Sequence, residues 1–208
     1  MKKLLFISLS ILIISFLASC GKKDYTSVEG QVLEKGSNKG VANAQVIFSE
    51  CVPGEGTGSS AICLDIETVL TNAQGKYIFT KEKDDATYYR IRAEKINYGK
   101  PIEVFQTANA GESTKNLNFT LPAAAWIKFH VKNVNPFDDN DLIIAPGSSG
   151  KGSHYHYGGK VDTTYIEKGI GNFNNAIYWT VKRNSNTKQF LDSVFLKPLD
   201  TVFYEIKY

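Results

Sequence analysis

The sequence lacks most of what catalysis and nucleic-acid binding require. It contains only three histidines, no Gly-x-Ser-x-Gly nucleophile elbow and no glycine-rich loop of the kind that cradles phosphates. A run of Lys and Arg is also missing: two of the 24 basic residues lie in positions 1–19, so 22 basic residues remain against 21 acidic ones. We therefore expect a non-enzyme without a cofactor and without a nucleic-acid partner.

Signals for helices are missing as well. Methionine occurs only at position 1, and no long stretch carries apolar residues at helical spacing. Tyr, Phe, Val, Ile and Thr are abundant, and these residue types favour strands. Short alternating runs separated by Gly, Asn and Asp clusters are typical of strands and turns. The sequence therefore predicts an all-β chain of two small antiparallel β-sandwich domains.

The amino terminus carries an apolar leader. Met1-Lys2-Lys3 gives a positive start, residues 4–17 are apolar apart from three serines, and Ala18 and Ser19 then precede Cys20. The apolar run of about 14 residues is shorter than the ~20 residues that a transmembrane helix needs. This layout predicts a signal peptide over residues 1–19 that is removed by cleavage.

Leu17-Ala18-Ser19-Cys20 resembles the signal box of bacterial lipoproteins. The resemblance implies that the thiol of Cys20 is joined to diacylglycerol and that this residue becomes the new amino terminus, with residues 20–25 as lipidated cysteine and tether. Several acyl chains would then hold the protein to the outer membrane. The alternative is an ordinary signal with a chance cysteine. In Bacteroidetes-type lipoproteins, acidic residues near the cysteine direct export to the surface; here only Asp24 is present, so the periplasmic and surface faces both stay open.

Residues 26–121 resemble the carboxypeptidase regulatory-like domain. The motifs that carry the resemblance are Glu29-Gly30-Gln31-Val32, Gly40 to Val46, Thr71 to Phe79, Tyr89-Arg90-Ile91 and Tyr98. The resemblance implies a transthyretin-like (prealbumin-like) sandwich of seven strands, in a domain that is not itself catalytic. Transthyretin-related hydroxyisourate hydrolases use histidines and a terminal Tyr-Arg-Gly-Ser motif. This chain has no histidine before position 130 and ends in Ile206-Lys207-Tyr208, so that activity is not expected.

Ile102, Val104 and Phe105 predict a further short strand. Residues 49–68 form an irregular insert in which Cys51 and Cys63 flank a segment rich in Gly and Ser. Beyond the inner membrane, two thiols that close a flexible loop are expected to form a disulfide, and two unpaired thiols are the alternative. The stapled loop is either a recognition loop or an insertion that the bridge merely stabilises.

Residues 122–208 predict the second sandwich. Pro122-Ala123-Ala124-Ala125 interrupts the strand pattern and marks the junction. After it, Ile127, Phe129 and Val131 alternate with Trp126, Lys128 and His130, which predicts one core face and one exposed face. The end of the chain alternates in the same way at Val202, Tyr204, Ile206 and Tyr208.

Two patterns in the second half bear on metal binding. His154-Tyr155-His156 places two imidazoles on one face of a strand, a geometry that suits zinc or copper, but two ligands are too few for a tight site. Asp138-Asp139-Asn140-Asp141 offers oxygen ligands without the glycine and distant glutamate of a calcium loop. We therefore keep His154 and His156 as weak candidates, interpret the acidic run as a solvated turn, and predict no metal site.

Aromatic residues of the second half suggest one further site. Trp126 and Trp179 are candidates for a platform on which a sugar ring stacks, together with nearby tyrosines. The sequence thus supports two functions. The first is a non-catalytic outer-membrane lipoprotein that binds a protein partner of the cell envelope as an adhesion or scaffold module. The alternative is a carbohydrate-binding accessory lipoprotein of a glycan uptake system.

Overall fold

The computed structural model describes residues 24–54, 60–147 and 153–208. Within these ranges every regular element is a β-strand, and no helix there is long and apolar enough to cross a membrane. The prediction of an all-β sandwich fold is confirmed. The predicted leader and the predicted lipidation site Cys20 lie outside the described residues.

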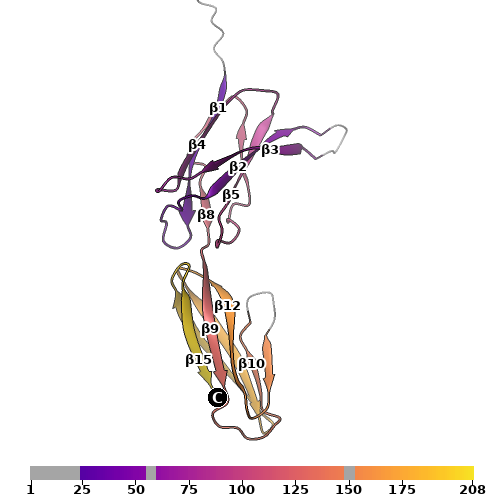
Figure 1. The fold of residues 1–208 in the computed structure, drawn as a ribbon. Coiled ribbons are helices and arrows are strands. Elements are labelled where there is room, and N and C mark those ends of the chain that lie inside the picture. The colour runs from indigo at the N-terminus through magenta and orange to yellow at the C-terminus, as the bar shows by residue number, and fades with distance from the viewer. Residues whose placement is uncertain (1–23, 55–59, 148–152) are drawn as a thin grey trace, which may run out of the picture.

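The first sandwich packs two sheets face to face (Figure 1). One sheet has the order β4-β1-β7, with β8 also pairing with β1. Its strands are β1 (Tyr25–Glu34), β4 (Lys76–Glu82), β7 (Ser113–Thr114) and β8 (Phe119–Leu121). The facing sheet has the order β3-β2-β5-β6. Its strands are β2 (Gln45–Val52), β3 (Ile62–Leu70), β5 (Tyr88–Glu94) and β6 (Gln106–Asn109). Because β7 and β8 lie in succession along β1, the described residues give the sandwich seven strand positions.

Alternating side chains of both sheets fill the core of the first sandwich. Phe48 of β2 and Phe79 of β4 stack with ring centroids 4.1 Å apart, and both are fully buried. The hydroxyl of Tyr77 donates a hydrogen bond to the Leu117 carbonyl at 2.5 Å. A Cβ atom at Gly30 would lie 1.9 Å from that same carbonyl oxygen, so this close approach of two backbones requires glycine.

Two sequence predictions for the first half are wrong. The stretch 49–68 is not an irregular insert, because β2 continues to Val52 and β3 begins at Ile62; only the Gly- and Ser-rich part separates them. Residues 102–104 form bends and Phe105 has no regular structure, so no strand forms there. Ile102, Val104 and Phe105 are each more than half exposed, so they have no core to face, and strand β6 starts after them.

The second sandwich also consists of two sheets, of orders β11-β10-β13-β14 and β12-β9-β15. The first of these contains β10 (Leu142–Ala145), β11 (His154–Tyr157), β13 (Phe173–Arg183) and β14 (Asn186–Leu196). The second contains β9 (Ala124–Lys132), β12 (Asp162–Ile170) and β15 (Thr201–Lys207). Ile127, Phe129 and Val131 are buried as the alternation predicted, and they join a core that is separate from the core of the first sandwich.

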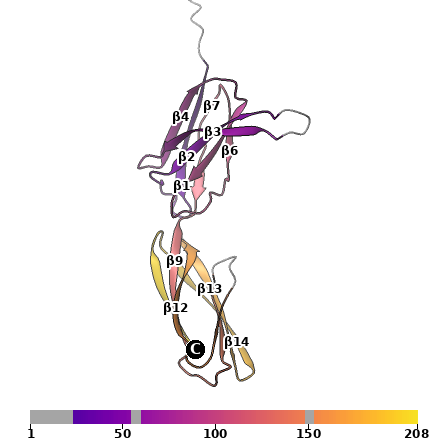
Figure 2. The same cartoon turned by 45° about the vertical axis from the view of Figure 1, so that its right-hand side comes forward.

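Both sandwiches hydrogen-bond the connection between β8 and β9. From the first sandwich, the Gly99 amide donates to the Pro122 carbonyl, and the Ala124 amide donates to the Asn97 carbonyl, both at 2.8 Å. From the second, the Gly171 amide donates to the Ala123 carbonyl at 2.9 Å. The connection is therefore an ordered joint, and the sandwiches lie end to end (Figures 1 and 2).

Glu34, at the end of β1, is the polar centre of this joint. Its buried carboxylate accepts hydrogen bonds from Ser37 (2.7 Å), Tyr98 (3.0 Å) and Asn172 of the second sandwich (2.9 Å). Asn172 also donates to the Lys35 carbonyl at 3.1 Å. Burial alone would raise the pKa of Glu34, but the three hydrogen bonds outweigh burial and hold the pKa below its ordinary value.

Replacing the asparagine of the joint tests this contact. Asn172→Gly keeps a residue that tolerates the positive φ of 65° at this position, but it removes both side-chain hydrogen bonds. We expect the free energy of unfolding in urea to fall by about 1–3 kcal/mol, since one lost bond ends on a buried carboxylate. Asn38→Gly is the matched control, because Asn38 also has positive φ and is exposed. Equal stability of the two variants would contradict the assigned role.

Candidate functional site

The hairpin of β2 and β3 extends beyond the body of the first sandwich. Strand β5 pairs with β2 only as far as Cys51, so beyond that point the hairpin consists of two strands. Figure 2 shows it projecting sideways from the sandwich. We call residues 50–64 of this hairpin the arm. It comprises the two-stranded part and the last two residue pairs beside β5, Glu50–Leu64 and Cys51–Cys63. Its described parts are 50–54 and 60–64.

A disulfide joins Cys51 to Cys63, which lie directly opposite each other in the β2–β3 register. The predicted bridge is confirmed. It is placed where the third strand ends, and an isolated two-stranded ribbon is at best marginally stable in water. The bridge therefore holds the arm where hydrogen bonding to the rest of the sheet stops. Ile62 and Leu64 beside it are 63% and 71% exposed.

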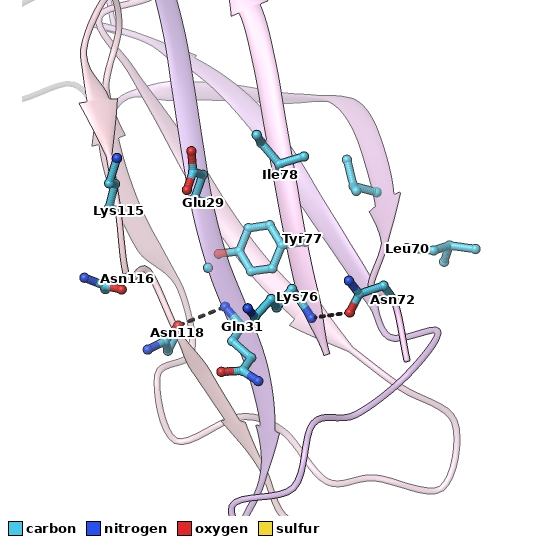
Figure 3. Close-up of a pocket in the computed structure, with 12 residues that line it drawn as sticks. Glu29, Gln31, Leu70, Asn72, Lys76, Tyr77, Ile78, Lys115, Asn116 and Asn118 are labelled. Carbon is cyan, nitrogen blue, oxygen red and sulfur yellow. Dashed lines mark hydrogen bonds between the residues drawn. The ribbon is translucent and has the colours of Figure 1, made fainter. Parts of the chain in front are cut away.

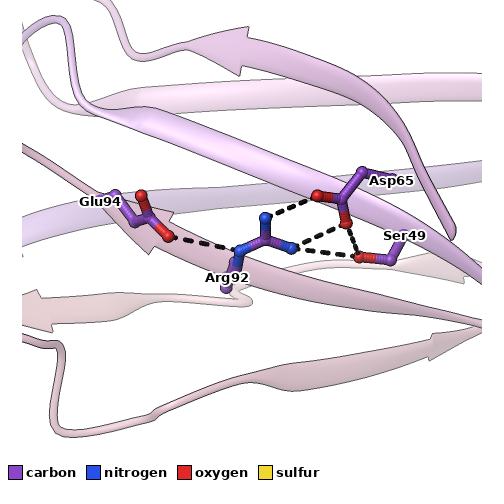
Figure 4. Close-up of polar contacts among 4 residues, drawn as sticks. All are labelled: Ser49, Asp65, Arg92 and Glu94. Carbon is purple, nitrogen blue, oxygen red and sulfur yellow. Dashed lines mark hydrogen bonds and ion pairs between the residues drawn. The ribbon is translucent and has the colours of Figure 1, made fainter. Parts of the chain in front are cut away.

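A polar cluster fixes the base of the arm (Figure 4). Arg92 of β5 donates two hydrogen bonds to the carboxylate of Asp65 on β3, at 2.8 and 2.7 Å. Ser49 of β2 donates to the same carboxylate at 2.6 Å, and the Arg92 guanidinium also contacts Glu94 at 3.3 Å. Paired N–H donors fix the geometry of a carboxylate more strictly than a single contact does. The three strands at the base are therefore tied together across their outer face.

A β-bulge lies next to this cluster. The β2–β3 register shifts between Phe48 and Ser49, so that β3 carries one extra residue, Ile66, at this point. Ile66 packs against the core. Bulges increase the local twist of a strand pair, so the bulge helps to turn the arm away from the sandwich.

A groove of about 620 Å³ lies on the outer face of β1 and β4 (Figure 3). Its lining includes Glu29, Gln31, Ile78 and Lys115. The side-chain oxygen of Asn118 accepts a hydrogen bond from the Gln31 amide at 2.8 Å, so part of the polar lining completes strand pairing. The lining contains no histidine, cysteine or serine.

The two histidines of β11 lie on the inner side of their sheet, with parallel rings 6.3 Å apart. His154 contacts Glu167 at 2.5 Å, and the Tyr165 ring lies 4.2 Å from the His154 ring. Burial, followed by the neighbouring His154, lowers the pKa of His156. Among the described residues there is no group of three or more His, Cys, Asp or Glu that could hold a metal ion. His154 thus contacts Glu167 and Tyr165 of the facing sheet at the edge of the sandwich.

The acidic run at 138–141 is only partly a solvated turn. Asp141 is fully buried, and its carboxylate accepts hydrogen bonds from Asn133, Arg183 and the Phe137 amide, each at 3.0 Å. Asp138 accepts a hydrogen bond from the Asn140 amide at 2.8 Å. All three donors bond the Oδ2 atom, whereas Oδ1 is buried without a hydrogen-bond partner among the described residues. Through Oδ2 the Asp141 carboxylate anchors the turn to the sandwich.

The two tryptophans lie on different sheets. Trp126 is on the outer face of β9, opposite Lys168 and Thr201. Trp179 is on the inner face of β13, packed against the core, with its ring stacked on Phe190 at 5.1 Å. The structure therefore does not bring them together into one platform. Exposed aromatic rings gather instead on the outer face of the β11-β10-β13-β14 sheet, at Tyr155, Tyr157 and Tyr178.

Comparisons with known proteins leave the family open. No protein-family model and no curated protein matches the sequence. Similar solved structures include the Bacillus anthracis TIE protein (11% identity, TM-score 0.37, 88% of this chain and 34% of that one). They also include the Streptococcal ancillary pilin (10% identity, TM-score 0.39, 88% of this chain and 62% of that one). A third is the minor pilin GBS52 of Streptococcus agalactiae (10% identity, TM-score 0.34, 88% of this chain and 94% of that one). This chain thus spans about a third of the first structure and under two thirds of the second. Likenesses this distant assign no function, and the carboxypeptidase regulatory-like family stays a prediction.

Replacing Arg92 tests the base of the arm through pH. Arg92 and Ser49, by hydrogen bonding, hold the pKa of Asp65 well below its usual range. A depressed carboxyl pKa adds stability above the unfolded pKa, and this stability is lost as the pH falls through the folded pKa. We expect Arg92→Gln to raise the Asp65 pKa toward its ordinary value of 3.8 in an NMR titration and to remove that loss at acid pH. Glu94→Gln, which keeps the Asp65 contact, is the control; a low Asp65 pKa in Arg92→Gln would disprove the assignment.

Proposed function

We propose that this chain is a non-catalytic lipoprotein of the bacterial outer membrane that binds a protein partner of the cell envelope through the arm. In this proposal the lipid is on Cys20 and residues 26–121 are a carboxypeptidase regulatory-like domain. The observation that carries the proposal is the arm itself, which presents exposed Ile62 and Leu64 on a ribbon held by the Cys51–Cys63 bridge. Neither side chain contributes to a core.

The construction of the arm suits binding. A ribbon fixed by a disulfide and by the Arg92–Asp65 contact loses little conformational freedom when it meets a partner, and such pre-organisation favours affinity. Strand β3 is the last strand of its sheet and pairs only with β2 among the described residues. Its free backbone groups are available to an extended segment of a partner, while the exposed apolar side chains supply contact area.

The position of the amino-terminal end also supports the proposal. Strand β1, whose first residue Tyr25 follows Cys20 by five positions, begins at the end of the first sandwich opposite the second sandwich (Figure 1). A lipid on Cys20 would hold the first sandwich close to the membrane and place the second sandwich away from it. The arm would then project sideways at the level of the first sandwich (Figure 2).

The anchor is tested by removing the sulfur. We expect Cys20→Ser to abolish incorporation of radiolabelled palmitate and to move the protein from the membrane fraction to the soluble fraction, because no thioether can form at serine. Cys51→Ser is the control, since it changes a cysteine elsewhere in the chain and should leave labelling intact. Unchanged membrane partitioning of Cys20→Ser would refute the lipid anchor without bearing on the arm.

The arm is tested by cross-linking in cells. A photo-reactive amino acid in place of Leu64 should form an adduct with an envelope protein, whereas the same group in place of Ile78, which is exposed on β4 away from the arm, should not. Leu64→Asp should weaken capture of that protein by at least about tenfold, since a central apolar contact contributes strongly to an interface. Equal adducts at both positions would count against the arm.

Carbohydrate binding is the second candidate. Tyr155, Tyr157 and Tyr178 are 59%, 68% and 50% exposed on one sheet face, and aromatic faces match the apolar faces of sugar rings. Saturable binding on a glycan array that is lost in Tyr155→Ala and kept in Trp179→Ala, with no adduct from the arm, would favour this function over the first.

A further inference from the structure

Strand β14 forms a long free edge of the second sandwich. It pairs with β13 over its whole length of 11 residues, and it has no strand partner on its other side within the described residues. An unpaired strand edge presents a row of N–H and C=O groups that can pair with another strand. The residues of this edge are mostly exposed, and Leu191 is 74% exposed.

The side chains of β14 alternate between two faces of the sheet. Phe190 lies opposite Trp179 in the β13–β14 register, and the two rings stack with an interplanar angle of 9°. Because alternate residues share a face, Lys188 and Asp192 lie on the same inner face as Phe190, one on each side of it. The Asp192 carboxylate accepts a hydrogen bond from the Tyr204 hydroxyl of β15 and stays exposed. The edge thus carries a positive charge, an aromatic ring and a negative charge at equal spacing.

We propose that two copies of this chain associate through β14, paired antiparallel with a twofold axis at Phe190. In this register Lys188 of one copy lies opposite Asp192 of the other, and the symmetry makes this ion pair twice. Opposite charges on directly facing strand residues are stabilising, and like charges are destabilising. The two sheets then join into one continuous sheet across the axis.

The aromatic ring at the axis fits the same arrangement. Neighbouring strands lie roughly 4.7–4.9 Å apart, which is close to the 5.1 Å between the Trp179 and Phe190 rings. The stack of Trp179 on Phe190 therefore continues into the Phe190 and Trp179 of the second copy. The exposed Leu191 gains a neighbour as well, because it lies opposite Gln189 of the second copy.

Three other registers of this edge place like charges opposite each other. A twofold axis at Lys188 places two lysines opposite each other, and an axis at Asp192 places two aspartates opposite each other. Parallel pairing in register produces both repulsions together. Among these arrangements, only an antiparallel pairing centred on Phe190 sets each charge of the edge opposite its complement.

Disulfide trapping in the full chain tests the register. Gln189 of one copy lies directly opposite Leu191 of the other copy. Gln189 lies only diagonally from Gln189 of the other copy, and Leu191 from Leu191, at roughly 7–8 Å. That distance exceeds the usual Cα separation of a disulfide. Chains carrying Gln189→Cys or Leu191→Cys should therefore cross-link under mild oxidation only when the two variants are mixed. Cross-linking that is equal in each variant alone, or absent from the mixture, would overturn the proposal.

Charge reversal provides a second test by sedimentation of the full chain in detergent. Lys188→Glu alone should weaken self-association by at least about tenfold, because both ion pairs become repulsive. The double variant Lys188→Glu, Asp192→Lys should restore it. Lys168→Glu, on β12 at an edge of the other sheet, should leave association unchanged. A cooperative urea transition shows that each variant folds, because Asp192→Lys also removes the hydrogen bond that Tyr204 donates to Asp192. Monomers at every concentration, or no loss in Lys188→Glu, would reject the dimer.

Discussion

The buried carboxylate of Glu34 determines how the two halves of the molecule meet. It collects donors from its own strand end, from Tyr98 and from Asn172 of the second sandwich. Leaving a buried carboxylate without its partners would cost more free energy than each hydrogen bond contributes when it forms. Loss of one of these hydrogen bonds would therefore weaken the whole joint. The end-to-end arrangement of the sandwiches and the position of the arm relative to the second core follow from this joint.

The sequence predicts the strands well where one face is buried. Alternation at Ile127, Phe129 and Val131 has a simple physical cause, since successive side chains point to opposite faces and one face meets a core. The same reasoning fails at Ile102, Val104 and Phe105, where apolar residues lie outside any strand on the surface. Apolar alternation alone does not say whether a core is present opposite the strand. The stretch 49–68 fails for the opposite reason, because its Gly- and Ser-rich tip obscures the strands on both sides.

Functional candidates are harder to predict, because they depend on pairs that are distant in the sequence. The Cys51–Cys63 bridge can be expected from composition and spacing, but the base of the arm joins Asp65 to Arg92, 27 residues away, and nothing local marks either residue. The joint brings Glu34 to Asn172 over 138 positions. Trp179 and Trp126 show the same limit: the sequence places both on strands, and only the pairing of strands shows that they belong to different sheets.

The Cys51–Cys63 bridge determines when the arm becomes fixed. Cytosolic thiols are kept reduced, so a bridge such as Cys51–Cys63 closes only where oxidants act on the chain. Until then the two-stranded ribbon beyond the last β5 partner has little to hold it. A copy kept in a reducing compartment would thus build both cores and still lack a fixed arm, so oxidation would complete the surface that we propose for binding.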